Sequence, residues 1–454
     1  MSEAVGIDRG VLKDRLDEEL ASFVDANPKS RALYERSQKS LIGGVPMPWM
    51  MRWAGGFPPF AKIAIGAHII DVDGHTYIDF CLGDTGAMTG HDPEPVVRAI
   101  TNQEKTGITT MLPTENAAWV GEEMSRRFGL DRWMFTLTAT DANRAALRIA
   151  RQITGRPKVL VYSYSYHGSV DESFAVAGPN GTTVSRAGNV GPPVDPSVTT
   201  TAVEFNDLDA LEAALATGEI ACVLAEPAMT NMGIVLPDDG YHDALRELTR
   251  KHGTLLIIDE THTFSAGPGG CTKAWGLEPD LFSIGKAIGS GVPAGALGMT
   301  AEVAEKMFSQ TDADYEDTGG VGGTLAGNAL SMTAVKATLS EVLTDEAWDY
   351  TVPLATQFSD GVKKVFADNG LPWNVTQLGA RAEYRFEDEP ARNGTQAHEA
   401  SDPELERYLH LHALNRGVLI TPFHNMALMS PATTAHDIDR HTEVFAEAIG
   451  DLLA

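Results

Sequence analysis

Long apolar runs are missing from this 454-residue sequence. No stretch of about 18 apolar residues occurs, and the N-terminal MSEAVGIDRGVLKDRLDEEL is polar and acidic, without the apolar core of a secretory signal. Membrane insertion and secretion are therefore not expected. Cysteine is also scarce: Cys81, Cys222 and Cys271 show no CxxC spacing and cannot all pair, which favours a reducing cytoplasm. No metal site is predicted.

Basic residues are in deficit, with 35 Lys and Arg against 62 Asp and Glu, giving a formal net charge of −27. Nucleic acids and anionic membranes would repel such a chain, so neither is expected as a partner. A well-solvated acidic surface explains this charge more simply than a salty habitat does. The length suffices for two domains, or for one large domain with a smaller partner.

The stretch from Thr254 to Gly289 suggests a site at the end of a sheet. An apolar run at 255–258 fits a strand buried on both faces and leads into Asp259, and a second run at 281–284 precedes Lys286 in a glycine-rich turn. Ligands of open α/β sheets bind beyond the carboxyl ends of strands, so both side chains are expected to face one pocket. An isolated acid there usually caps a turn, and an isolated lysine is usually solvated.

An amine and an acid at opposite ends of a flat cofactor are what pyridoxal phosphate (PLP) requires. The lysine forms the Schiff base, and the carboxylate keeps the pyridine nitrogen protonated so that the ring accepts electrons. Strand and helix patterns alternate from about residue 130 to 300, which is typical of a parallel sheet with helices on both faces.

A candidate phosphate site lies where a short strand at 133–137 meets a helix. Backbone amides and the positive end of the helix dipole converge at Thr138, Ala139 and Thr140, an arrangement that suits a phosphate. A simple N-cap by Thr138 explains the same residues and is favoured by the local sequence alone.

DETHT and SIGKAIGSGVPAGALG resemble the aspartate and lysine signatures of the class III aminotransferases, which are fold-type I PLP enzymes. The chain is most similar to the branch containing glutamate-1-semialdehyde aminomutase and the β-amino-acid transaminases, from about Leu41 to the C-terminus. The resemblance implies an α/β fold with a mostly parallel, seven-stranded-type sheet flanked by helices and a smaller α+β domain built from both chain ends. The expected domains are residues 1–82, an N-terminal segment joining the small domain; 83–332, which bind PLP; and 333–454, the C-terminal small domain.

The same resemblance assigns residues to the cofactor. TLTATDAN aligns with the phosphate loop, with Ala139 in place of the usual glycine. Tyr166 is expected to stack on the pyridine ring with His167 beside it, although a tyrosine that merely fills the core is the alternative. Glu226, in EPAMTNMG, is expected near the cofactor.

Two residues of DETHT and one later threonine complete the expected cofactor site. Thr261 matches the position that packs on the ring face, and His262 matches a position near the ring hydroxyl, where a histidine could tune the Schiff base. A satisfied histidine beneath the loop is the alternative for His262. Thr324, in GGVGGTLAGNALSM, matches a threonine that reaches the phosphate of the neighbouring subunit, which implies a homodimer with shared active sites.

Three residues are candidates for the substrate side. Trp49 and Arg52 lie in GGVPMPWMMRWAGGFPPF, a loop that fits either a substrate wall or a hydrophobic plug. The resembled branch carries a substrate-facing arginine in this region, which Arg52 matches only after a shift in register. Asp84 lies at the expected pocket edge, where an acid could receive a substrate amine, with turn capping as the alternative.

The resemblance implies an aminotransferase that moves an amino group from an amine or β-amino-acid donor to a keto acid or aldehyde. Lys286 would move the proton as general base and acid, and Asp259 would stabilise charge on the ring. The preference for such donors follows from Leu378, which occupies the position of the family's carboxylate-binding arginine. The alternatives are an aminomutase or racemase on the same scaffold and, from another class, a nucleotide-binding α/β protein.

Overall fold

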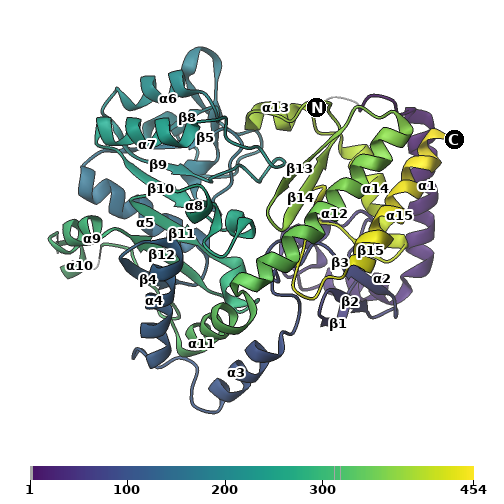
Figure 1. Ribbon diagram of the computed structural model, residues 1–454, viewed down its shortest axis with the longest axis horizontal. Helices are drawn as coiled ribbons and strands as arrows, with labels where there is room; N and C mark the ends of the chain where they lie inside the picture. Colours follow the sequence, from purple (N-terminus) through teal and green to yellow (C-terminus); the bar gives the residue numbers. More distant parts are fainter. Residues whose placement is uncertain (1–3, 311, 317) are drawn as a thin grey trace. The chain divides into compact units, whose positions relative to one another are not determined.

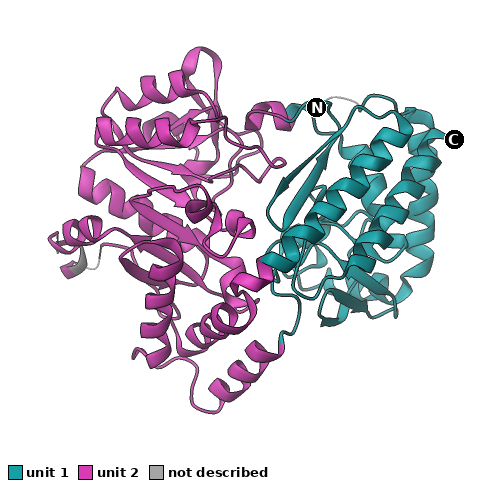
Figure 2. Cartoon of the chain, in the orientation of Figure 1, with its two compact units in different colours: residues 1–93, 349–390, 399–454 teal, residues 94–348, 391–398 magenta. Residues whose placement is uncertain are grey.

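The computed structural model describes residues 4–310, 312–316 and 318–454. The chain forms two compact units (Figure 2). Unit 1 contains the residues up to Pro93 together with Asp349–Pro390 and Glu399–Ala454, and unit 2 contains Glu94–Trp348 and Ala391–His398. The domain limits expected from the sequence, after residues 82 and 332, stay predictions.

Unit 2 is built on a seven-stranded sheet with the order β4-β12-β11-β10-β9-β5-β8 (Figure 1). All neighbouring pairs are parallel except those that β12 makes with β11 and β4. The strands are β4 (Arg132–Thr136), β5 (Lys158–Tyr162), β8 (Thr200–Val203), β9 (Ile220–Ala225), β10 (Leu255–Asp259), β11 (Leu281–Ile284) and β12 (Gly295–Met299). The mostly parallel sheet expected from the alternating pattern is thus confirmed.

Both faces of this sheet are buried, as the apolar strands predict. Along β5, Val159 and Val161 join an apolar cluster with α5 (Ala139–Thr154), whereas Leu160 and Tyr162 join another with α6 (Leu208–Leu215) and α7 (Tyr241–His252). The other elements of this unit are α3 (Glu94–Glu104), α4 (Glu115–Phe128), β6 (Ala175–Ala177), β7 (Thr183–Ser185), α8 (Gly270–Ala274), α9 (Ala301–Phe308), α10 (Asp312–Tyr315), α11 (Ala329–Ala337) and α13 (Gly394–Glu399), whose last residue lies in unit 1.

Unit 1 joins the two ends of the chain. Its four-stranded sheet has the order β1-β2-β3-β15, and Val418 of β15 pairs in parallel with Ile78 of β3. The strands are β1 (Ala61–Ile65), β2 (His68–Asp71), β3 (Thr76–Asp79) and β15 (Val418–Leu419), and a second sheet contains β13 (Asn374–Leu378), β14 (Arg381–Arg385) and β16 (Met426–Leu428). This agrees with the α+β domain that the resemblance implies.

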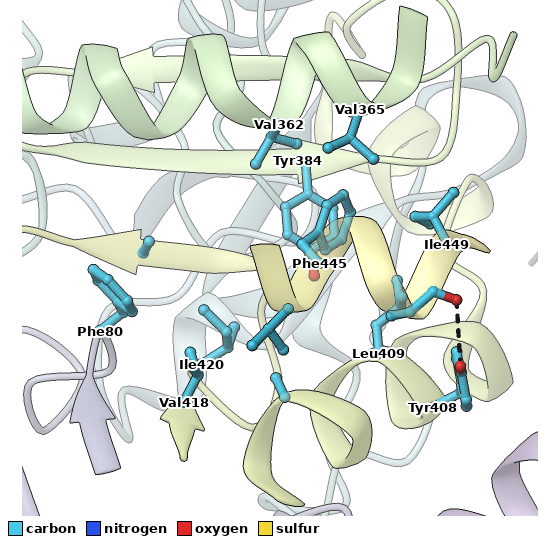
Figure 3. Close-up of a cluster of buried hydrophobic side chains, with 14 of the residues drawn as sticks. Phe80, Val362, Val365, Tyr384, Tyr408, Leu409, Val418, Ile420, Phe445 and Ile449 are labelled. Carbon is cyan, nitrogen blue, oxygen red and sulfur yellow. Dashed lines mark hydrogen bonds between the residues drawn. The ribbon is translucent and has the colours of Figure 1, made fainter. Parts of the chain in front are cut away.

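Five α-helices complete the described part of unit 1. They are α1 (Arg9–Ala26), α2 (Pro28–Ser37), α12 (Asp345–Asn369, which begins in unit 2), α14 (Pro403–Asn415) and α15 (Ala435–Leu453). Figure 3 shows Val362 and Val365 of α12, Tyr384 of β14, and Phe445 and Ile449 of α15 within one buried cluster. Among the helices of the described residues, none has both the length and the apolar character needed to cross a membrane.

Candidate active site

The structure brings Asp259 and Lys286 to the same edge of the sheet. Asp259 ends β10 and is opposite Ser283 of the parallel strand β11, and Lys286 follows β11 after one glycine. Lys286 has a φ of 49°, a left-handed conformation that costs a non-glycine residue free energy and often marks a functional position. The placement at neighbouring strand ends is the one that the sequence predicts.

The turn of Lys286 also meets the start of α5. A Cβ atom added at Gly285 would lie 3.0 Å from the backbone nitrogen of Ala139, so a side chain there would push the two segments apart. The glycine therefore lets the lysine turn approach the helix N-terminus closely. A cofactor whose phosphate lies at that terminus and whose aldehyde meets an amine suits this arrangement.

Asp259 is held in a buried hydrogen-bond network. Its Oδ2 accepts from Asn143 Nδ2 at 2.8 Å and lies 2.9 Å from His167 Nδ1, and its Oδ1 accepts from the hydroxyl of Thr261 at 2.6 Å. Burial opposes ionisation, yet the hydrogen bonds from His167, Thr261 and Asn143 lower the pKa of Asp259 to about 2. The side chain is therefore a fixed anion, suited to face a protonated ring nitrogen.

Two members of this network, Asn143 and Ser283, are not among the residues that the sequence analysis predicts. Asn143 is fully buried on α5, and its side-chain oxygen accepts a hydrogen bond of 2.5 Å from the hydroxyl of Ser283 on β11. The amide of Asn143 also donates to the backbone oxygen of His167 at 3.2 Å. Asn143 thus orients Asp259 from a neighbouring helix. It ends the TLTATDAN motif, which is the one clue that the sequence offers.

Lys286 and His262 are in direct contact. The lysine Nζ lies 2.8 Å from His262 Nε2, which is a hydrogen-bond distance, and the tautomer of His262 decides which of the two atoms donates. The sequence assigns His262 to the neighbourhood of the ring hydroxyl, and the structure places it beside the lysine amine. Its expected contact with the cofactor stays a prediction.

Thr138 is the N-cap of α5. Its hydroxyl accepts from the backbone nitrogen of Asp141 at 3.3 Å and donates to the Asp141 carboxylate at 2.9 Å, so the capping alternative describes this side chain. Thr140 lies against Gly168, where an added Cβ would be 1.9 Å from its hydroxyl oxygen. The tight packing of Thr140 fixes the first turn of α5 beside the His167 segment. Phosphate binding by Thr138, Ala139 and Thr140 stays a prediction.

Two buried polar atoms near Asp259 have no hydrogen-bond partner among the described residues. They are His167 Nε2 and Glu226 Oε1, while the other oxygen of Glu226 accepts from the hydroxyl of Thr230. Burial, with a smaller contribution from Asp259, raises the pKa of Glu226 to about 7. A buried atom without a partner is costly unless a ligand satisfies it, which fits a polar cofactor here. Tyr166 packs edge-on against Phe174, with ring centroids 6.4 Å apart.

The remaining candidates are Trp49, Arg52, Asp84 and Thr324. Trp49 and Arg52 belong to unit 1, where both contact the ring of Phe423: the two ring centroids are 5.4 Å apart, and the guanidinium carbon is 5.4 Å from the Phe423 centroid. Asp84 is also in unit 1, in a left-handed conformation with a φ of 51°. Thr324 is exposed in unit 2, between α10 and α11.

Known proteins resemble the whole chain. The model of the family "Aminotransferase class-III" matches residues 50–449. A glutamate-1-semialdehyde 2,1-aminomutase of Acidobacterium capsulatum is 35% identical over 431 residues, covering 92% of this chain and 99% of the relative. A glutamate-1-semialdehyde 2,1-aminomutase of Methanocaldococcus jannaschii is 32% identical, covering 87% of this chain and 91% of the relative.

Solved structures of an aminomutase and a transaminase are also similar to this chain. The structure of a glutamate-1-semialdehyde-aminomutase from Pseudomonas aeruginosa PAO1 in complex with PMP has a TM-score of 0.96 and 46% identity, covering 99% of this chain and 100% of the other. An omega-transaminase from Sphaerobacter thermophilus has a TM-score of 0.85 and 28% identity, covering 94% and 98%. The fold-type I architecture and the PLP cofactor inferred from the resemblance are confirmed.

Proposed function

Because this chain belongs to the class III aminotransferase family of PLP-dependent enzymes, we propose that it is an aminomutase. An aminomutase moves an amino group between two carbons of one substrate, whereas an aminotransferase passes it to a separate acceptor. The observation that carries the proposal is the likeness to the Pseudomonas aeruginosa aminomutase, at 46% identity over nearly the whole chain. It favours the aminomutase alternative over the aminotransferase that the sequence analysis put first.

Lys286 is the proposed covalent anchor and proton carrier. PLP, when bound, supplies an electron sink for the carbon that loses a proton. Lys286 Nζ takes that proton and returns it elsewhere on the substrate, acting first as general base and then as general acid. His262 Nε2, 2.8 Å away, holds the amine in place and exchanges protons with it between these steps. The left-handed backbone of Lys286, with a φ of 49°, supports this role, because such strained conformations cluster at active sites.

Asp259 and the start of α5 are proposed to hold the two ends of the cofactor. Asp259 is an anion that four donors fix in position, and it would keep the ring nitrogen protonated. Thr138, Ala139 and Thr140 would hold the phosphate at the positive end of the α5 dipole. A rigid anion and a rigid helix terminus would orient the ring without reorganisation during turnover.

The proposed substrate is an amino aldehyde of the glutamate 1-semialdehyde type. The test supplies glutamate 1-semialdehyde to the holoenzyme with no amino donor and no keto acid, and follows the isomer by NMR. An aminomutase converts many equivalents, because the amino group returns to the same carbon skeleton. Conversion that stops near one equivalent of enzyme until an acceptor is added would refute the proposal. Lys286→Ala is the control and should convert nothing under either condition.

Amino transfer between two molecules is the second candidate. Its support is the likeness to the Sphaerobacter thermophilus omega-transaminase, and a beta-phenylalanine aminotransferase from Variovorax paradoxus adds to it, with a TM-score of 0.84 and 27% identity. A panel of amines and β-amino acids with a keto acid acceptor separates the two functions. Rapid amino transfer without isomerisation would favour this candidate.

A dimer with shared sites is proposed as well. Thr324 is exposed, which suits a residue that serves a second subunit. Sedimentation should report a dimer, and Thr324→Ala should release PLP sooner than wild type on dilution. A monomer that retains PLP and full activity would contradict the shared site.

A further inference from the structure

A cluster of titratable side chains lies within unit 1, on three helices that contact one another. Glu19 belongs to α1, His412 to α14, and Glu447 and Asp451 to α15. The hydroxyl of Tyr408 on α14 donates to a backbone oxygen of α15 at 3.3 Å, which ties these two helices together (Figure 3). Potential metal-ligand atoms of His412, Glu447 and Asp451 all lie within 4.8 Å of one another.

The imidazole of His412 is completely buried, and only one of its nitrogens has a partner. Its Nδ1 lies 3.2 Å from Glu19 Oε1, whereas Nε2 is buried without a hydrogen-bond partner. Glu19 is itself held in place, because it accepts hydrogen bonds from Asn415 Nδ2 at 2.6 Å and from Arg416 Nη1 at 2.8 Å. With Glu19 at Nδ1, Nε2 is the nitrogen of His412 that is available to an ion. Carboxylates orient metal-binding histidines in this way.

The two acids come from one face of α15. Glu447 and Asp451 are four residues apart in the sequence, which places them one above the other along the helix. Arg416 Nε donates to Glu447 Oε1 at 3.1 Å and thus engages one of the two carboxylate oxygens. Arg15 Nε lies 3.4 Å from the backbone oxygen of Asp451. Glu447 is exposed and Asp451 half-buried, whereas His412 Nε2 is buried, so the cluster runs from the surface into the core of unit 1.

We propose that His412 Nε2 and the carboxylates of Glu447 and Asp451 bind a divalent transition-metal ion of the Zn²⁺ type, with Glu19 orienting the imidazole. One imidazole and two carboxylates suit zinc, whereas magnesium and calcium prefer oxygen ligands alone. Water completes the coordination. The ion joins α14 to α15 and, through Glu19, to α1, so the site is structural and lies outside the Lys286 network. The proposal does not depend on the function of that network.

Calorimetric titration of the chelator-treated holoenzyme with Zn²⁺ tests the site. Saturable binding of one ion per chain is expected, and Asp451→Asn and Glu447→Gln should each weaken it by at least about tenfold. Glu443→Gln is the matched control, because Glu443 is an exposed acid one turn earlier on α15 that pairs with Arg440. Equal affinities for Asp451→Asn and this control would overturn the proposal, as would the lack of a saturable site.

The role of the histidine needs its own measurement. X-ray absorption at the zinc edge should show one imidazole nitrogen among oxygen ligands, and His412→Gln should remove that nitrogen. Because a buried substitution can unfold the chain, Glu19→Gln is the second variant, with an expected loss of affinity of about 10 to 100-fold. Circular dichroism checks that both variants fold. Zinc bound by oxygen alone, or undiminished affinity in Glu19→Gln, would contradict the assignment.

Discussion

Replacing Asn143 by alanine tests the network that fixes Asp259. The change removes the 2.8 Å hydrogen bond to the Asp259 carboxylate and leaves the hydroxyl of Ser283 without its acceptor. A hydrogen bond to a charged group contributes roughly 1.5 to 3 kcal/mol, so the free energy of unfolding should fall by about 2 to 3 kcal/mol near neutral pH. Denaturant unfolding of the holoenzyme measures this loss.

The pH dependence of that loss separates electrostatics from packing. The pKa of Asp259 is lowered from 3.8 to about 2, so its ionised form stabilises the fold above pH 3.8, and this stabilisation disappears as the pH falls through about 2. In Asn143→Ala the pKa of Asp259 in the folded state should rise. The stability gap between variant and wild type should therefore be full above pH 4 and close toward pH 2.

A control variant on the same helix separates the loss of this hydrogen bond from a general effect of substitution in α5. Gln152, near the C-terminal end of α5, donates to the backbone oxygen of Gln310 in a solvent-exposed hydrogen bond of 2.9 Å. Gln152→Ala should cost at most about 0.5 kcal/mol, at every pH. If Asn143→Ala costs no more than this control, or if its cost stays constant down to pH 2, then Asn143 does not act through the charge of Asp259.

Three further predictions concern single side chains. Burial raises the pKa of Glu226 from 4.5 to about 7, so the free energy of unfolding of the wild type should fall as the pH rises between these values. Denaturant titrations of Glu226→Gln should show a smaller fall, and an unchanged fall would mean that Glu226 does not cause it. His262→Leu removes the 2.8 Å contact with Lys286 and should lower kcat and alter its pH profile while PLP absorbance is retained; an unaltered kcat profile would refute proton exchange. Arg52→Ala should raise KM for acidic substrates but spare simple amines, and equal losses on both would mean that Arg52 serves only its stacking on Phe423.

The tendency of ligands to bind beyond the carboxyl ends of parallel strands predicts where Asp259 and Lys286 lie. Asp259 and Lys286 follow apolar runs that form adjacent parallel strands, so their proximity needs only sheet topology. The same reasoning predicts the helix start at Thr138, where the structure shows the N-cap. These positions were predictable because the features that mark them lie close together in the sequence: short apolar runs mark the strands, and a threonine marks the start of the helix.

Other contacts arise only from tertiary packing. Ser283 lies inside the apolar run of β11 and gives no local sign that its hydroxyl holds Asn143. The cluster around His412 joins helices from opposite ends of the chain, and neither helix predicts the other's register. The contact between His262 and Lys286 likewise depends on how two loops meet after β10 and β11. Local patterns in a single sequence do not show which distant residues come into contact.

Mapping the covalent attachment of PLP tests the account most directly. The holoenzyme is reduced with borohydride, digested and sequenced by mass spectrometry, with Lys286→Ala treated in parallel. The account predicts a single phosphopyridoxyl adduct on the peptide that contains Lys286, and none in the variant. An adduct on another lysine, or its absence from the reduced wild-type enzyme, would contradict the central claim.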